Sequence, residues 1–125
     1  MKVFSVEEAN ALLPSVRGIL SRIQRTYKQI VSYKTAAKYA AEGAEQGGGG
    51  MSDGPYYVSL LVELFAQTSE LETLGVQLKD HARGLIDFPS LRDGRVILLC
   101  WQLGEGDEIE WWHDVEDGFA GRQPL

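Results

Sequence analysis

The sequence predicts an α+β fold, in which a long antiparallel helical hairpin precedes a small antiparallel β-meander. Three observations support this prediction. A row of apolar residues at helical spacing fills the first third of the chain, four glycines at 47–50 separate it from a second such row, and short apolar runs between turn residues follow Gly75. The chain has 125 residues, enough for one core of ordinary size, so we expect a single domain over residues 1–125.

The first helix is predicted over about residues 6–41. Ser5 and Glu8 have the spacing of a capping box, in which each side chain accepts a hydrogen bond from the backbone N–H of the other residue. Pro14 removes one backbone hydrogen bond, so we expect a kink or a restart of the helix there. An apolar row with alternating spacings of four and three supplies the packing face: Ala9, Leu13, Val16, Leu20, Ile23, Tyr27 and Ile30.

Residues 43–54 have the sequence GAEQGGGGMSDG, which predicts a flexible connector without a core of its own. A second helix is predicted over about residues 55–75, with Gly54 as N-cap, Pro55 as the first helical residue and Gly75 as the stop signal. Two long helices joined by one connector form an antiparallel hairpin most simply. The predicted packing row of the second helix comprises Tyr57, Leu60, Leu61, Leu64, Leu71 and Leu74.

The β-meander is predicted over about residues 76–114 and an irregular tail over 115–125. If Leu103 and Glu108 flank a four-residue turn, paired residues have numbers that add to 211. Leu98, Cys100, Trp111 and His113 then share one face of the sheet, while Leu99, Trp101 and Trp112 share the other. Both faces are mostly apolar, so each needs a cover. The helices can cover one face. A second subunit or the C-terminal tail must cover the other face, and the need for this second cover is the reason that we expect a homo-oligomer.

The net charge is −6, which excludes a general nucleic-acid binder, because neutralising phosphates requires a basic surface. No apolar run approaches the roughly 18 residues that cross a bilayer, so we expect no membrane partner. The acidic N-terminal residues do not resemble a signal peptide, and one cysteine cannot form an internal disulfide. These features predict a cytoplasmic protein.

Cys100 and His113 are diagonal neighbours in this register, about 7 Å apart at Cβ. Thiolate and imidazole are ligands for zinc or iron, and a carboxylate from Asp87, Glu105 or Asp114 could complete a divalent-metal site. Seven acidic residues and no Lys or Arg occur between positions 105 and 117. Either a basic helix packs beside this acidic segment, within or between chains, or the segment holds a cation. The alternative interpretation is that Cys100 packs as a small apolar residue and that His113 is a hydrogen-bonded structural histidine.

Besides the metal site, another hypothesis is a small-ligand site at the open end of the sheet. It would use the guanidinium groups of Arg95 and Arg122 together with Trp101, Trp111 and Trp112. The alternative is that both arginines form salt bridges and that the tryptophans are core or interface residues. No spacing singles out a catalytic pair, so the leading functional hypothesis is a non-enzymatic, oligomeric interaction protein.

The segments EANALLP, KD, GLIDFP, DGR, LLCWQLGE, WWHD and GFAGR, in this order, resemble a family of small uncharacterised bacterial proteins classed as a domain of unknown function. The resemblance spans nearly the whole chain. It implies a helical hairpin followed by a small β region, and it transfers no activity, cofactor or catalytic residue. The family's characteristic segments contain Asp87, Arg95, Cys100, Trp101, Glu105, His113 and Arg122.

Overall fold

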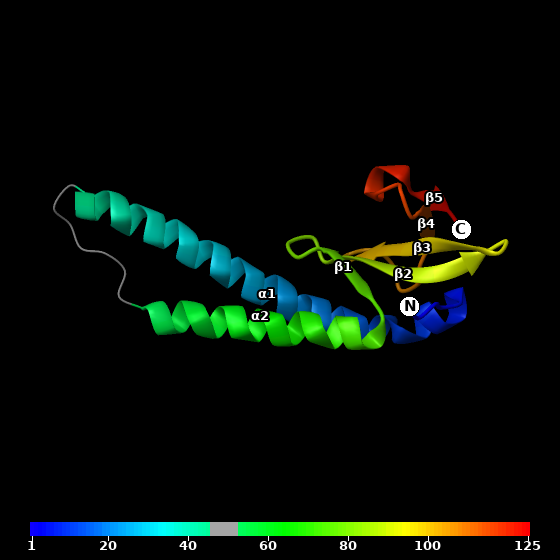
Figure 1. Cartoon of the computed structure of the whole chain (residues 1–125), viewed down its shortest axis with the longest axis horizontal. Coiled ribbons are helices and arrows are strands. Elements are labelled where there is room, and N and C mark those ends of the chain that lie inside the picture. The colour runs from blue at the N-terminus through cyan, green and yellow to red at the C-terminus, as the bar shows by residue number, and fades with distance from the viewer. Residues whose placement is uncertain (46–52) are drawn as a thin grey trace.

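The computed structural model describes residues 1–45 and 53–125, in which two helices precede a five-stranded antiparallel sheet (Figure 1). The predicted α+β class is therefore confirmed. The strands lie in the order of the chain, β1-β2-β3-β4-β5, so each connection joins neighbours. The elements are α1 (Val6–Glu45), α2 (Gly54–Leu74), β1 (Gln77–Asp80), β2 (Leu85–Arg92), β3 (Arg95–Gln102), β4 (Trp111–Asp114), the 3₁₀ turn η1 (Phe119–Gly121) and β5 (Gln123–Pro124).

Helix α1 begins with the predicted capping box. The Ser5 N–H donates to the Glu8 carboxylate at 3.0 Å, and the Glu8 N–H donates to the Ser5 hydroxyl at 3.1 Å. The helix then continues to Glu45 without interruption, with the exposed Pro14 inside it. Of the two possibilities considered, a kink or a restart at Pro14, the uninterrupted helix rules out the restart. Leu13 and Val16, on either side of Pro14, are both fully buried in the same core, and this packing outweighs one missing hydrogen bond.

The ends of α2 differ in part from the prediction. Asp53, not Gly54, is the N-cap, because its carboxylate accepts a hydrogen bond from the Tyr56 N–H at 3.3 Å. Gly75 ends the helix as predicted, in a left-handed conformation with φ of 87°. Residues 46–52 of the predicted connector lie outside the described residues, while 43–45 belong to α1.

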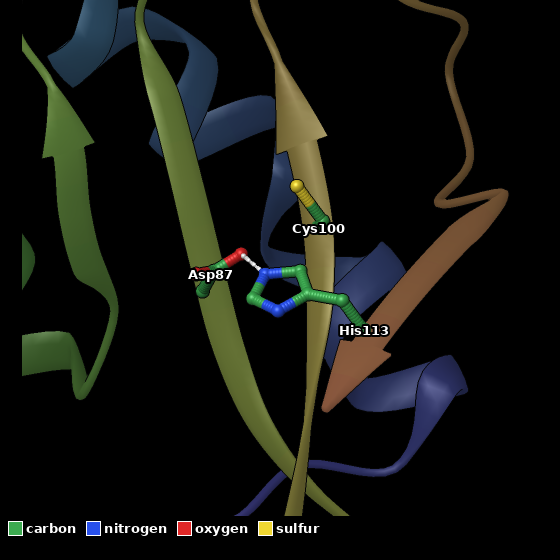
Figure 2. A group of neighbouring side chains, drawn as sticks. All are labelled: Asp87, Cys100 and His113. Atoms are coloured by element: carbon green, nitrogen blue, oxygen red, sulfur yellow. Dashed lines mark hydrogen bonds and ion pairs between the residues drawn. The ribbon is translucent and has the colours of Figure 1, made fainter. Parts of the chain in front are cut away.

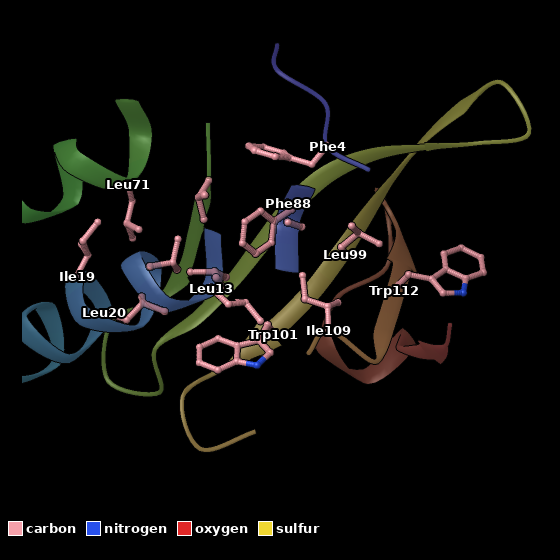
Figure 3. Close-up of a cluster of buried hydrophobic side chains, with 14 of the residues drawn as sticks. Phe4, Leu13, Ile19, Leu20, Leu71, Phe88, Leu99, Trp101, Ile109 and Trp112 are labelled. Carbon is pink, nitrogen blue, oxygen red and sulfur yellow. The ribbon is translucent and has the colours of Figure 1, made fainter. Parts of the chain in front are cut away.

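The main core lies between the N-terminal part of α1 and one face of the sheet (Figure 3). Phe88, Leu99 and Trp101 project from β2 and β3 toward Leu13 and Leu20 of α1, and all five side chains are at most 1% exposed. Burying each of these side chains contributes about 1.5–3 kcal/mol relative to exposure. This face of the sheet is therefore the one that fixes the sheet onto the hairpin.

The register of β3 and β4 follows the predicted sum of 211 where the strands pair. Leu98 is opposite His113, and Cys100 is opposite Trp111. The predicted tight turn does not form, because β4 begins only at Trp111. Ile109 is instead turned into the core, 5% exposed, and its N–H donates to the Asn10 side chain of α1 at 2.7 Å. Residues 103–110 are consequently a loop anchored on α1.

The second face of the sheet is covered by the C-terminal segment, which forms η1 and β5 on the side opposite α1 (Figure 1). The prediction of a wholly irregular tail was wrong on this point. Leu98, Cys100 and His113 are at most 4% exposed within the single chain. The C-terminal tail, one of the two covers considered from the sequence, therefore covers this face. The burial of this face does not require a second subunit.

Helix α2 carries a row of exposed apolar side chains opposite its buried side. Its buried residues are Leu60, Gln67 and Leu71, whereas Leu61, predicted to pack inward, is 42% exposed. We call the exposed residues the α2 outer row; they are Val58, Leu61, Val62 and Phe65, which are 42–75% exposed and spaced as i, i+3, i+4 and i+7. Among the described residues, no helix is long and apolar enough to span a membrane.

The turn glycines Gly84 and Gly94 allow a controlled test of the sheet geometry. Both have positive φ, 62° and 78°, but a Cβ at Gly84 would lie 2.6 Å from the Leu103 side chain, while Gly94 has open space. We expect Gly94→Ala to cost about 1–2 kcal/mol from backbone strain alone. Gly84→Ala should cost roughly 1–3 kcal/mol more through overpacking. Urea unfolding of both variants measures the difference, and equal midpoints would contradict the predicted contact.

Candidate metal site

Asp87, Cys100 and His113 converge on the face of the sheet that the C-terminal segment covers. They come from the adjacent strands β2, β3 and β4, and Asp87 is the register partner of Cys100. One ligand atom from each residue lies within 4.8 Å of the other two, and the three residues are 1–3% exposed. Figure 2 shows the carboxylate, thiol and imidazole side by side. The diagonal placement of Cys100 and His113 predicted from the sequence brings them together with a carboxylate.

The imidazole of His113 is held at both ring nitrogens. Nδ1 lies 2.8 Å from the backbone carbonyl oxygen of Asp114, and Nε2 lies 3.0 Å from Oδ1 of Asp87. A carbonyl oxygen can only accept a hydrogen bond, so Nδ1 must carry a proton and donate it. This contact fixes the orientation of the ring and leaves Nε2 facing the carboxylate.

The contact between Nε2 and Asp87 requires a positive charge. In the neutral ring with its proton on Nδ1, Nε2 presents a lone pair, and the carboxylate oxygen presents another. Two acceptors stay 3.0 Å apart only if a proton lies between them or a cation lies close to both. The two residues therefore either share a buried proton or are two ligands of one metal ion. Both arrangements satisfy the rule that buried charge must be compensated.

The Cys100 thiol is neutral when no cation is bound. Burial and, to a smaller extent, the negative charge of Asp87 raise the pKa of this thiol to about 12, while Arg122 opposes the shift. A neutral buried thiol is a weak nucleophile, so the geometry does not favour cysteine catalysis. A divalent cation would reverse this balance, because metal coordination stabilises the thiolate directly.

Glu105 and Asp114, the other two predicted ligands, point elsewhere. The Glu105 carboxylate accepts from Arg122 at 2.7 Å and from the Gln102 N–H at 2.8 Å. The Asp114 carboxylate forms a salt bridge of 2.9 Å with Arg95. Only the backbone carbonyl of Asp114 belongs to the site, as the partner of the imidazole. Asp87 is thus the carboxylate that joins Cys100 and His113.

The arginines and tryptophans proposed as a small-ligand site do not form one site. Trp101 lies on the opposite face, where its indole N–H donates to the Gly106 carbonyl. The Arg95 guanidinium lies 5.9 Å from the Trp112 ring, and that of Arg122 lies 5.1 Å from Trp111. Both arginines also form salt bridges, as the alternative interpretation expected. Their structural contacts account for them without a ligand.

A pocket of about 150 Å³ opens beside the three converging residues. Its remaining lining comes from Lys79, Leu85 and residues 117–119. The Phe119 ring lies between two guanidinium groups, 4.2 Å from that of Arg83 and 4.6 Å from that of Arg122. Sequence reasoning missed this lining, because Phe119 belongs to the tail and only its packing under the arginines brings it to the site.

The pKa of Cys100 predicts a specific loss of stability at alkaline pH in metal-free protein. The ordinary pKa of 9.0 applies to the unfolded chain and about 12 to the folded one. The stabilising contribution is therefore complete below pH 9 and is lost as the pH rises toward 12. Between pH 8 and pH 10 we expect the wild type to lose about 1 kcal/mol that Cys100→Ala does not lose. Urea titrations in the presence of a chelator measure this difference, and parallel pH profiles would contradict it.

The comparisons with known proteins give one match. The family described as an uncharacterized conserved protein (DUF2203) matches residues 2–125, which is nearly the entire chain and includes all three converging residues. No curated protein and no solved structure matches the chain. The match agrees with the family resemblance noted in the sequence, and its description names no activity.

Proposed function

Because the chain belongs to the uncharacterized conserved protein family DUF2203, whose description names no activity, we propose a function from the geometry: the protein binds a divalent metal ion through Asp87, Cys100 and His113. The observation that carries this proposal is the convergence of a carboxylate, a thiol and an imidazole within 4.8 Å in a buried position. Such a donor set suits zinc or iron.

The charges of the site support a divalent ion. The Asp87 carboxylate and a Cys100 thiolate together carry two negative charges, and the neutral His113 ring carries none. A divalent cation therefore makes the buried cluster neutral, as burial requires. In the metal-free state a thiol proton and a proton between Nε2 and Asp87 provide the same neutrality, so the metal replaces two protons.

The contacts of His113 support its role as a ligand. Histidine ligands of metals usually donate the second ring N–H to a backbone carbonyl or a carboxylate, which orients the free nitrogen toward the ion. The 2.8 Å contact from Nδ1 to the Asp114 carbonyl has this form. Zn–N and Zn–S bonds of about 2.0 and 2.3 Å in a tetrahedron require ligand atoms roughly 3.5 Å apart. Small side-chain rotations reach that spacing from separations of up to 4.8 Å.

Elemental analysis of protein purified without a histidine tag tests the proposal. We expect about one zinc or iron per chain in the wild type, and little in His113→Asn or Cys100→Ala. His81→Asn is the matched control, because His81 lies in the turn before β2 and stacks on Tyr27 away from the cluster. Wild-type protein that takes up no metal on incubation with zinc or iron(II) would show that the cluster is a structural ion pair instead.

We also propose that the protein self-associates through the α2 outer row. A helix that is apolar on all sides is normally buried on all sides, and α2 is apolar both toward α1 and away from it. A twofold pairing of α2 with α2 of a second copy would complete a four-helix bundle. The molar mass in solution, measured by light scattering, tests this proposal, and a monomer at high micromolar concentration would contradict it.

Two further expectations from the sequence support the same picture. A free cysteine without a disulfide partner is typical of proteins in reducing compartments, which supports a cytoplasmic location. The net charge of −6 supports the absence of nucleic-acid partners. With the metal site and the α2 outer row, these two expectations complete the proposal of a small cytoplasmic metal-binding protein that pairs with itself.

A further inference from the structure

The metal site has three protein ligands and no fourth among the described residues. The group of potential ligands found there contains Asp87, Cys100 and His113 alone. Of the neighbouring acids, Glu105 and Asp114 are held by Arg122 and Arg95, and Asp117 lines the pocket but lies outside this group of ligands. Zinc with three protein ligands keeps a fourth position for water or another molecule, whereas closed structural sites use four protein ligands. The ligand count therefore indicates an open coordination position.

The open position faces a pocket rather than packed side chains. All three ligand residues line the pocket of about 150 Å³. This volume corresponds to roughly five water molecules, well below the roughly 300–1,000 Å³ of sites for drug-sized ligands. Leu85 and Phe119 form its apolar side. The occupant must therefore be a molecule of only a few non-hydrogen atoms.

The charges around the pocket favour a small anion. The metal with its Asp87 and Cys100 ligands is neutral, so a bound monoanion brings one uncompensated negative charge. Lys79 lines the pocket and is solvent-exposed, so its long side chain can bring the ammonium group to a bound anion. The guanidinium groups of Arg83 and Arg122 lie against the ring of Phe119, which lines the same pocket. Besides the metal ligand Asp87, the acidic residue in the pocket lining is Asp117. Because Arg122 is already paired with Glu105, Lys79 and Arg83 are the two cations that remain against Asp117, and this balance favours an anionic ligand.

We propose that the metal held by Asp87, Cys100 and His113 binds a small monoanion at its open position, such as a carboxylate of a few atoms, and that Lys79 strengthens this binding. This inference rests on the proposed metal-binding function. Residues 117–119 limit the size of the anion, because they line the pocket together with the sheet residues. Lys79 acts as a specificity residue that contacts the bound anion and not the metal.

Cobalt(II) gives an experiment that separates the two proposals. Cobalt is added to the metal-free 125-residue chain, and the visible absorption of the cobalt is recorded during titration with azide, acetate and the bulky 2-naphthoate. We expect a thiolate-to-cobalt band on metal addition, followed by saturable changes with azide and acetate but not with naphthoate. Lys79→Met should weaken acetate binding about fivefold without changing the cobalt stoichiometry. Lys34→Met, at an exposed position on α1, is the control and should bind acetate like the wild type.

Each outcome decides one point. A cobalt spectrum that no anion changes would overturn the open position, while metal binding itself stands. Equal acetate affinities of the wild type and Lys79→Met would overturn the role of Lys79, and equal responses to acetate and naphthoate would overturn the size limit. A chain that binds no cobalt, zinc or iron would overturn the metal site and this inference together.

Discussion

Zinc at a free concentration 100 times its Kd is expected to raise the melting temperature of the wild-type protein by about 10 °C. Binding at that concentration adds about 2.7 kcal/mol, provided that the unfolded chain does not bind the metal. The shift equals this free energy divided by the unfolding entropy, which is about 2.1 cal/mol/K per residue. For 125 residues the result is about 10 °C. The measurement is a thermal melt by circular dichroism with and without zinc.

Cys100→Ala should lose most of this shift while keeping a folded metal-free state. The alanine methyl group fills much of the space of a buried thiol, and Asp87 and His113 keep their mutual contact. His81→Asn, which changes the histidine outside the cluster, should shift like the wild type. Equal zinc shifts in the wild type and Cys100→Ala would show that zinc binds elsewhere, and the assignment of this thiol as a ligand would be wrong.

Phe65→Glu is expected to weaken self-association at least 100-fold. Phe65 is 75% exposed in the single chain, so the substitution leaves the helical hairpin intact. In a paired state the carboxylates would be buried against the apolar outer row of the second copy. Burying an unpaired charge costs several kcal/mol, and about 2.7 kcal/mol already corresponds to a factor of 100 in Kd. Sedimentation equilibrium of both proteins over a range of concentrations measures the change.

Leu91→Glu is the matched control for this substitution. Leu91 is also an exposed apolar residue, 59% exposed, but it lies at the end of β2 and not on α2. The same charge placed there should leave the association constant within a few-fold of the wild type. If Phe65→Glu associates as tightly as Leu91→Glu, the interface is not the α2 outer row, even where the wild type is oligomeric.

The helical row of α1 and the pairing of β3 with β4 were predictable because each follows one strong local pattern. The buried row from Ala9 to Ile30 repeats at heptad spacing, and a single packing direction follows from it. Alternation along a strand likewise fixed Cys100 and His113 on one face once the register was chosen. These two local rules were sufficient to bring two of the three converging residues together.

The remaining features depend on contacts between distant segments. The choice of Asp87 over Glu105 and Asp114 follows from Arg122 and Arg95, which bind the other two carboxylates. The orientation of α2 was ambiguous because apolar residues occur around the whole helix, so Leu61 was assigned to the wrong face. The loop before β4 is set by a hydrogen bond from Ile109 to Asn10, 99 residues apart, which no local pattern reveals.

That hydrogen bond also bears on how fast a metal ion can leave. Asp87 and Cys100 lie on β2 and β3, which an immediate turn joins, whereas His113 lies on β4, beyond the loop anchored to Asn10. If the proposed site holds a metal ion, opening of β4 would separate the imidazole from the other two ligands without unfolding the β2–β3 hairpin. We therefore expect the opening rate of β4 to set the lifetime of the bound ion, and Asn10 on α1 to influence that rate from a distance.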